Sequence, residues 1–325
     1  MILEGAVKFT VYLDQNILGH LFEGESAKED LLRVLEQFRE RGAAFVYSDV
    51  HVEECQAFFR PEKYIRVLDE IDACYIQPTE RLEKHFAIKS NMAGDLIKCE
   101  PDFASKSLTF LSSLMTVSQF ALGWLGELEA EELMRELEVE LDLWIEELSR
   151  ETYGLCDTAP IRQQLLASLL SLDVKALKKE GLAQQPQTDS EWNKRFSRID
   201  ELPTEDVANF IFGEIGSDAA QHLRGLFPSK IWPDGVYVEN GTLTGLAFFL
   251  FTQGVGRDRK VKSGGQSNRR KRFQSQFRDC RHIENAARCD VFISNDRRAI
   301  NLAQATYAYS GVKTIAKYVK IRGSQ

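Results

Sequence analysis

Two apolar runs with the composition of β-strands lie at opposite ends of this chain, and an aspartate follows each of them closely. Lys8 to Leu13 leads directly into Asp14, and Val291 to Ser294 is followed by Asp296. Aspartate is depleted inside strands, so these residues mark strand ends. In a parallel sheet, ligands bind outside the carboxyl ends of the strands. We therefore expect both ends of the chain to enter one sheet and to present their carboxylates at a shared edge.

Both ends of the chain alternate between strand-like and helix-like segments, which predicts a parallel sheet. The further elements expected there are a short helix from Ile17 to Phe22, a helix from Glu29 to Arg41, a strand from Ala43 to Tyr47, a helix that begins after Ser48, a helix from about Phe273 to Ala287, a helix from Arg297 to Tyr309 and a strand from Thr314 to Ile321.

The middle of the chain, from about Pro61 to Val255, carries apolar residues at three- and four-residue spacing and little strand signal. We predict an α/β fold in which residues 1–60 and 256–325 form one discontinuous domain, a parallel sheet flanked by helices. Residues 61–255 are expected to form a large all-helical insertion.

Composition narrows the class of protein. The chain has 325 residues and a formal net charge of -8, so any nucleic-acid contact would require a local basic patch. Its six cysteines form no CxxC pair, which indicates reduced thiols and a cytoplasmic protein. The N-terminus lacks the pattern of a signal peptide, and the apolar run from Leu243 to Val255 is shorter than the roughly 18 residues that span a bilayer. We expect no membrane partner.

Three motifs resemble those of PIN-domain nucleases. LDQNIL resembles the opening Asp-x-Asn motif after the first strand, and YSDVHVEE resembles a helix led by Ser48 with an acidic residue six positions later. RDCRHIENAARCDVFISND resembles the closing block of a helix-borne aspartate and a strand that ends in Ser-x-Asp. The resemblance covers roughly the first 60 and the last 70 residues, and it implies a PIN-like sheet.

The resemblance also implies a site and an activity. Four residues occupy the acidic metal-site positions, Asp14, Glu54, Asp279 and Asp296, while Asn16 and Ser294 match polar residues that support the site. The implied activity is that of a divalent-metal-dependent endonuclease that leaves a 5′-phosphate and a 3′-hydroxyl, with RNA favoured over DNA. Two alternatives stay open: a structure-specific DNA nuclease, and an inactive PIN-like scaffold whose helical insertion binds a protein partner or self-associates.

Physical chemistry favours a metal at such a cluster. Two carboxylates about 4 Å apart repel by roughly 4 kcal/mol at an effective dielectric near 20, so a cation is needed to keep several of them ionised. Oxygen ligands select Mg²⁺ or Mn²⁺ over zinc. Such an ion can activate water and stabilise the leaving oxygen of a phosphodiester.

Each candidate also has a simpler structural role. Asp14 could cap the helix that follows it, and Asp279 could pair on the surface with Arg278 or Arg281. The spacing from Ser48 favours Glu54 over Glu53 as the residue that faces the site. His282 lies one turn after Asp279, where it would orient that carboxylate, contact phosphate, or serve only as a packing histidine.

A basic cluster precedes the helix that carries Asp279. We read residues 257–272 as a flexible loop whose cations would guide a nucleic-acid backbone, or would form a solvated counterpart to the acidic insertion. The residues expected to bind nucleic acid are Arg269, Arg270, Lys271 and Arg272.

Overall fold

The structure is a computed structural model, and it describes residues 7–23, 25–56, 61–77, 87–89, 130–151, 157–171, 179, 185–215, 227, 242–257 and 266–321. The chain forms two compact units. The first consists of residues 1–99, 193–258 and 276–325, and the second of residues 100–192 and 259–275. The predicted insertion spanned residues 61–255; in the structure, residues 61–99 and 193–255 belong to the same compact unit as the two chain ends.

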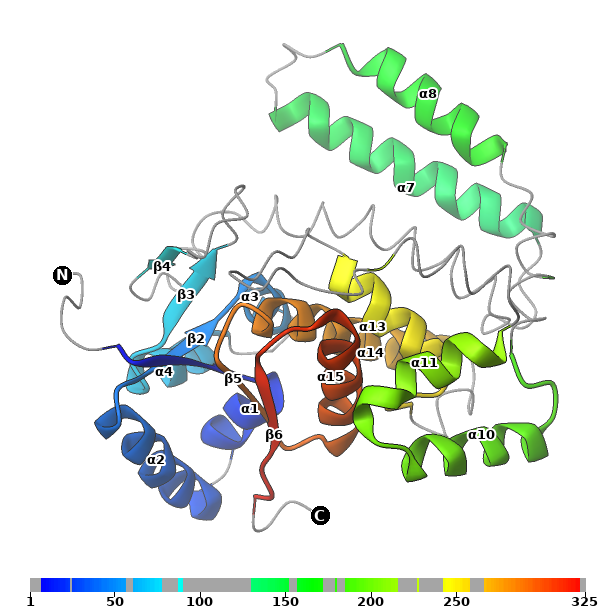
Figure 1. Cartoon of the computed structure of the whole chain (residues 1–325). Coiled ribbons are helices and arrows are strands. Elements are labelled where there is room, and N and C mark those ends of the chain that lie inside the picture. The colour runs from blue at the N-terminus through cyan, green and yellow to red at the C-terminus, as the bar shows by residue number, and fades with distance from the viewer. Residues whose placement is uncertain are drawn as a thin grey trace. The chain divides into compact units, whose positions relative to one another are not determined.

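The first unit is built on a six-stranded sheet (Figure 1). Its strands are β1 (Phe9–Leu13), β2 (Ala43–Tyr47), β3 (Cys74–Gln77), β4 (Ala87–Lys89), β5 (Val291–Ser294) and β6 (Ile315–Tyr318). Their order is β4-β3-β2-β1-β5-β6, in which β4 alone runs antiparallel to its neighbour. Leu13 of β1 pairs with Ile293 of β5, so the two chain ends lie side by side. This confirms the predicted α/β fold with a parallel sheet flanked by helices.

Strands β3 and β4 depart from the all-helical expectation for residues 61–255. Helix α4 (Pro61–Glu70) ends where Asp72 adopts a left-handed φ of 49° and the amide of Ala73 bonds to the carbonyl of Leu68 at 2.9 Å. The chain then enters β3, whose Cys74 pairs with Val46 of β2. A four-residue strand directly after a helix leaves too little periodicity to be recognised in the sequence.

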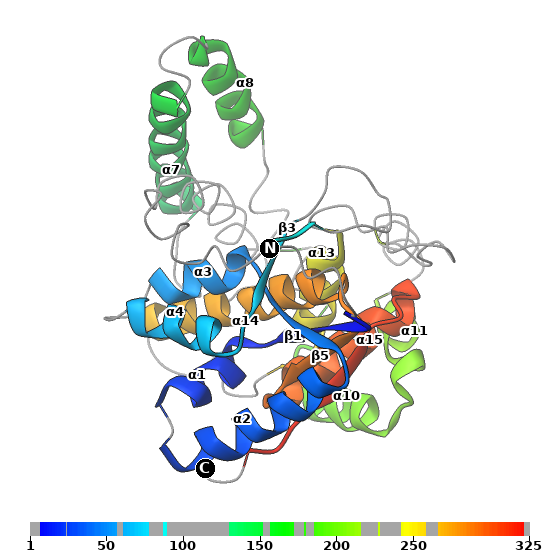
Figure 2. The ribbon, with the colours of Figure 1, turned by 90° about the vertical axis from the view of Figure 1, so that its left-hand side faces the viewer.

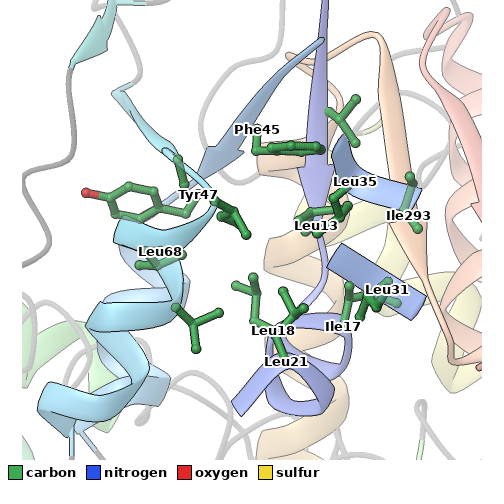
Figure 3. Packing of buried hydrophobic residues seen from close by; sticks show 14 of the residues in the cluster. Leu13, Ile17, Leu18, Leu21, Leu31, Leu35, Phe45, Tyr47, Leu68 and Ile293 are labelled. Carbon is green, nitrogen blue, oxygen red and sulfur yellow. The ribbon is translucent and has the colours of Figure 1, made fainter. Parts of the chain in front are cut away.

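One face of the sheet is apolar and is covered by α1 (Gln15–Glu23), α2 (Glu25–Glu40) and α4 (Figure 3). Val11 and Leu13 point to this face from β1, because alternate residues of a strand share a face. Leu31 and Leu35 of α2 meet them at helical spacing. The other labelled members of this cluster are Ile17, Leu18, Leu21, Phe45, Tyr47, Leu68 and Ile293.

The opposite face is covered by the part of α14 (Gln266–Ala286) that belongs to the first unit, from Gln276 onward, and by α15 (Arg297–Ser310), as the turned view helps to show (Figure 2). The Tyr307 hydroxyl of α15 donates to the carbonyl of Ile283 in α14 at 2.6 Å and ties the two helices together. Helices α11 (Thr204–Glu214) and α13 (Thr242–Thr252) pack against α15 in turn.

Helix α14 begins earlier than the sequence indicated. Its backbone is helical from Gln266, so Arg269 to Arg272 lie in a helix and the prediction of a loop there is wrong. Regular i to i+4 bonding extends through the basic residues, whose long side chains are good helix formers. The side chains of Arg269, Arg270, Lys271 and Arg272 lie outside the part of the chain that the structure describes.

Helix α15 is held at both ends. Asp296 caps its N-terminus, accepting a bond from the amide of Arg298 at 2.7 Å. Gly311 ends it in the left-handed conformation at φ 72°. Gly256 reaches the first turn from the segment after α13, and a Cβ there would lie 2.5 Å from the carbonyl oxygen of Arg298. These contacts place the start of α15, and with it Asp296, beside the end of β5.

In the second unit, α7 (Ala130–Glu151) and α8 (Thr158–Leu170) form a helical pair. Leu137, Leu141 and Ile145 are buried along α7 at four-residue spacing. Arg162 of α8 bonds to Asp142 of α7 at 2.7 Å. In the ranges that the structure describes, no helix combines the length and apolar character needed to cross a bilayer.

Candidate active site

The carboxyl ends of β1 and β5 form the topological switch point of the sheet. From β1 the chain continues to β2 on one side, and from β5 it continues to β6 on the other side. The connecting helices therefore cover opposite faces and diverge between these two strands, which leaves room for a ligand at their ends. Asp14 follows β1 and Asp296 lies two residues after β5.

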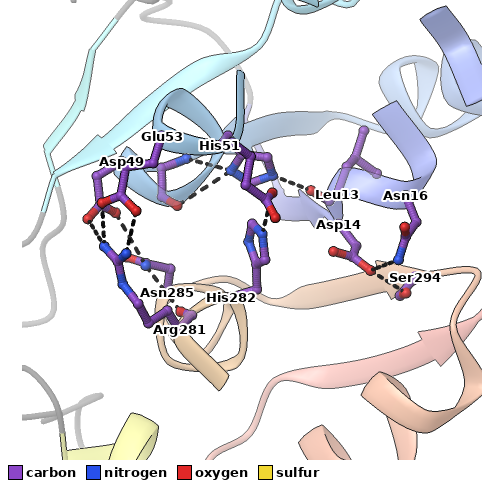
Figure 4. A network of polar contacts seen from close by, with 12 residues as sticks. Leu13, Asp14, Asn16, Asp49, His51, Glu53, Arg281, His282, Asn285 and Ser294 are labelled. Atoms are coloured by element: carbon purple, nitrogen blue, oxygen red, sulfur yellow. Dashed lines mark hydrogen bonds and ion pairs between the residues drawn. The ribbon is translucent and has the colours of Figure 1, made fainter. Parts of the chain in front are cut away.

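Asp14 is buried, with 2% of its surface exposed, and its carboxylate bonds to side chains from two elements. Ser294 of β5 donates to its Oδ2 at 2.5 Å, and Asn16 of α1 donates to the same oxygen at 3.1 Å (Figure 4). The backbone carbonyl of Asp14, rather than its carboxylate, accepts the first amides of α1, from Ile17 and Leu18. The two polar residues expected to support the site thus do contact Asp14.

Burial raises the pKa of Asp14 above its usual value, and the charge of Glu54 adds to this effect. The charge of His282 and the hydrogen bonds from Ser294 and Asn16 oppose it. The ionised form of Asp14 is therefore disfavoured by burial and supported by specific partners. A cation at this position would offset the free-energy cost of ionising the buried carboxyl group of Asp14.

Asp296 has two roles around the same serine. The Ser294 hydroxyl that contacts Asp14 also accepts the amide of Asp296 at 2.9 Å, so one side chain joins both strand ends. One carboxylate oxygen of Asp296 is used as the N-cap of α15. Asp296 thus caps the helix that follows it, α15, whereas Asp14 meets the first amides of α1 with its backbone carbonyl.

Asp279 approaches from α14 and is half-buried. Burial raises the pKa of Asp279 well above its usual value. The negative charges of Asp14, Asp296 and Glu54 raise it further, and the positive charge of Arg278 acts in the opposite direction. The four predicted carboxylates therefore lie in one electrostatic field, although they come from four different elements. Gln276 donates to Asp279 at 2.9 Å.

Helix α3 (Asp49–Gln56) carries Glu53 and Glu54, and the structure gives them different partners. Glu53 accepts hydrogen bonds from the two terminal nitrogens of the Arg281 guanidinium, at 2.5 and 2.8 Å. Asp49 accepts a third hydrogen bond from Arg281 at 2.9 Å. Glu54 instead contacts His282 at 3.0 Å and shares the field of Asp14 and Asp279. Glu53 is thus held in a clamp between α3 and α14, and Arg281 bonds with α3 rather than with Asp279.

His282 lies one turn after Asp279 but bonds to Glu54, a different carboxylate from the one that the sequence suggested. Its Nε2 lies 3.0 Å from Glu54, and its Nδ1 lies 2.7 Å from the hydroxyl of Tyr12. Burial alone would lower the pKa of His282, but the charge of Glu54, its hydrogen bond and the charge of Asp14 outweigh burial and raise the pKa. The imidazolium form therefore offsets part of the negative charge of the cluster.

A second histidine lies behind His282. The rings of His51 and His282 have centroids 4.7 Å apart. His51 Nδ1 accepts the amide of Ser48 at 3.0 Å, so His51 must donate from Nε2 to the carbonyl of Leu13 at 2.8 Å. Burial lowers the pKa of His51 well below its usual value, so this ring is neutral.

Sequence reasoning missed three members of this network. They are Tyr12, His51 and Arg281, the last of which had been considered only as a surface partner of Asp279. Tyr12 lay in an apolar strand and was counted only as part of that strand. Its one available signal was position: Tyr12 and Asp14 are two residues apart and so share a face of the sheet.

The donor set fits a hard divalent ion in chemical type, because it offers carboxylate oxygens supported by a serine and an amide. Across the described residues, no three acidic, histidine or cysteine side chains are already gathered as closely as metal ligands would be. The described carboxylates interact through their charges and through shared neighbours.

Comparison of the sequence with protein-family models found no match, and comparisons with curated proteins and with solved structures found no significant similarity.

Proposed function

We propose that this chain is a divalent-metal-dependent endonuclease of the PIN-like type, acting on RNA through Asp14, Glu54, Asp279 and Asp296. The observation that carries the proposal is the meeting of the two strand ends, where the Ser294 hydroxyl donates to the carboxylate of Asp14 at 2.5 Å and accepts the amide of Asp296 at 2.9 Å. The charges of Asp14, Asp296 and Glu54 also raise the pKa of Asp279, which agrees with this arrangement. Four acidic residues that share one field at the switch point of a parallel sheet are suited to binding a cation.

The chemistry requires only groups that this site offers. Mg²⁺ or Mn²⁺ bound by carboxylates would supply an activated water and stabilise the leaving oxygen of a phosphodiester. Asp14 and Asp296 would hold the ion from the strand ends, Glu54 and Asp279 from the two helices. Ser294 and Asn16 would orient Asp14 by the bonds that they already make.

Basic and aromatic groups next to the carboxylates fit a nucleic-acid substrate. Arg297 is exposed at the start of α15, directly after Asp296, and its guanidinium lies 5.0 Å from the ring centroid of Tyr318. Tyr318 pairs with Ser294 across the strands and is 37% exposed. A phosphate could bind Arg297 while the ring of Tyr318 offers a stacking surface. Arg269, Arg270, Lys271 and Arg272 remain the proposed contacts farther along α14.

The test is cleavage of labelled single-stranded RNA and DNA with Mg²⁺, Mn²⁺ or EDTA. We expect cleavage of RNA that requires the metal, and at least a hundredfold loss in Asp14→Asn, since even a partner of a metal ligand is worth about 10- to 100-fold. The matched control is Asp290→Asn, at the other end of β5, where Asp290 accepts bonds from the amide and hydroxyl of Thr10 at 2.7 and 3.0 Å.

The outcomes separate the alternatives. Cleavage of DNA but not RNA would replace the substrate with DNA and keep the metal site. Metal-independent cleavage, or full activity in Asp14→Asn, would refute the mechanism. No cleavage of either substrate would favour the inactive scaffold.

A further inference from the structure

The carboxylate of Glu54 depends on a chain of buried groups that runs into the sheet. Glu54 contacts His282 Nε2 at 3.0 Å, and the other ring nitrogen of His282 contacts the Tyr12 hydroxyl at 2.7 Å. Because both ring nitrogens have a partner, the ring can neither rotate nor shift without losing a bond. The orientation of Glu54 thus depends on a tyrosine that it does not touch.

Tyr12 is well suited to holding this ring. Its side chain is fully buried, its ring packs edge-on against Phe292 with centroids 5.9 Å apart, and its hydroxyl has a second partner in Ser48 Oγ at 2.8 Å. The pKa of Tyr12 is raised well above its usual value by burial, so the phenol keeps its proton. A neutral hydroxyl can donate one bond and accept another.

The hydroxyls of Tyr12 and Ser48 can serve His282 in either of its charge states. If His282 carries one proton, on Nε2, the Tyr12 hydroxyl donates to Nδ1 and accepts from Ser48. If His282 carries two protons, Tyr12 accepts from Nδ1 and donates to Ser48. The neutral ring of His51 accepts the Ser48 amide at Nδ1, at 3.0 Å. The same nitrogen lies 3.4 Å from the Tyr12 hydroxyl, a longer contact than the 2.7 Å between that hydroxyl and His282.

The geometry also links the two acidic positions. Tyr12 lies in β1, and Asp14 directly follows the end of this strand, so the same segment carries Asp14 itself and holds Glu54 through His282. Metal ligands commonly depend on hydrogen-bond partners that orient them.

We propose that Tyr12 is a positioning residue of the metal site, acting through His282 to aim Glu54 at the bound ion. This inference rests on the proposed function. It predicts that removing one buried hydroxyl, without changing any ligand, weakens metal binding.

The experiment measures Mn²⁺ binding to the full chain by titration calorimetry, without substrate. Tyr12→Phe should raise the Mn²⁺ dissociation constant by about tenfold, at the lower end of what partners of metal ligands contribute. The matched control is Tyr307→Phe, which also removes a buried hydroxyl bonded to α14 but at the backbone of Ile283. It should leave Mn²⁺ binding within about twofold of wild type.

A double-mutant cycle separates positioning from general loosening. Tyr12→Phe should have almost no further effect, less than about twofold, when His282 is already changed to alanine, because the two residues act in one chain. His282→Asn is the second variant if alanine prevents folding. Circular dichroism on each preparation reports whether the chain is folded.

Two results would overturn the inference while leaving the nuclease proposal intact: Mn²⁺ binding by Tyr12→Phe that equals that of Tyr307→Phe, or a full Tyr12→Phe effect in the His282 variants. Failure of the wild-type chain to bind Mn²⁺ or Mg²⁺ would instead overturn both proposals.

Discussion

Strand β1 presents two different environments on its two faces. Val11 and Leu13 enter an apolar cluster with α1, α2 and α4, whereas Tyr12 faces α14 and joins a buried hydrogen-bond network. Apolar packing is non-directional and depends mainly on volume and burial. The network requires each donor to meet a particular acceptor, and an unmatched buried group is costly. Many combinations of apolar residues would therefore satisfy the packing on one face of β1. Few combinations of residues would satisfy the hydrogen bonds on the other face.

The comparison suggests that the two faces of the sheet in the first unit have different effects on stability. The apolar face stabilises the sheet, whereas burial and neighbouring negative charges disfavour the ionised form of Asp279 on the polar face. The following changes test whether the two faces differ in this way.

The largest expected effect on stability is at the clamp between α3 and α14. Arg281→Ala leaves Glu53 buried without its partner, since the Arg281 and Glu53 side chains are 13% and 8% exposed. Breaking a buried ion pair on one side typically costs about 3–5 kcal/mol. Urea unfolding should show this loss. The control is Arg33→Ala on α2, whose pair with Asp30 is exposed, and a similar loss there would contradict the reasoning.

On the apolar face, Leu68→Ala should lower the free energy of unfolding by about 2–5 kcal/mol, because Leu68 is 2% exposed within the cluster. Metal affinity and the cleavage rate of the folded fraction should stay at wild-type values. Urea unfolding and cleavage assays on the same preparation check both parts. A loss of metal affinity in this variant would show that the two faces are coupled.

The polar face should respond to pH in the absence of metal. Burial and neighbouring carboxylates raise the pKa of Asp279 in the folded chain, so its contribution favours folding at low pH and is lost as pH rises from the unfolded value of about 3.9 through the folded pKa. In EDTA at pH 8, Asp279→Asn should therefore be more stable than wild type. Asp30→Asn, at an exposed position, is the control.

The pH prediction has a second part. The gain in Asp279→Asn should shrink at acid pH, where the wild-type carboxyl group is protonated, and should reverse at saturating Mn²⁺, where the ionised ligand is needed. Thermal melts at several pH values would show this. Lower stability of Asp279→Asn in EDTA at pH 8 would mean that the carboxylates do not repel.

The smallest effect is expected at the edge of the site. Arg297→Gln should weaken binding of single-stranded RNA and lower the log-log salt slope by about 0.7, the value for one phosphate contact. Fluorescence anisotropy at several salt concentrations in EDTA would measure it. Arg66→Gln, exposed on α4 at the opposite face, should leave the slope unchanged. Equal slopes in both variants would assign Arg297 to packing on Tyr318 alone.

Much of the fold could be predicted from local patterns. Strand β5 has the predicted bounds, and β1 and β2 lie where apolar runs with strand-forming residues indicated them. Strands β3 and β4 and the early start of α14 were missed, because a short strand after a helix has little periodicity and a run of basic residues resembles a loop.

At the candidate site, Asp14 and Asp296 could be named because an aspartate after an apolar run is unusual enough to be visible locally. In the sequence, only the spacing from Ser48 distinguished Glu54 from Glu53 as the candidate site residue. The structure shows that Glu54 contacts His282, whereas Glu53 is bonded to Arg281. Helical spacing places His282 one turn after Asp279, which made that carboxylate one of the candidate partners of His282, while the actual contact crosses to Glu54 on α3.

The sequence by itself determined which segments at the chain ends alternate between strand and helix, and which aspartates lie at strand ends, because these features are visible within a few neighbouring residues. Only the tertiary structure decided the network behind them. The partners of the Tyr12 hydroxyl lie 36 residues away at Ser48 and 270 residues away at His282. A hydrogen bond depends on distance and direction between two atoms, and no local pattern encodes a pairing across that length of chain.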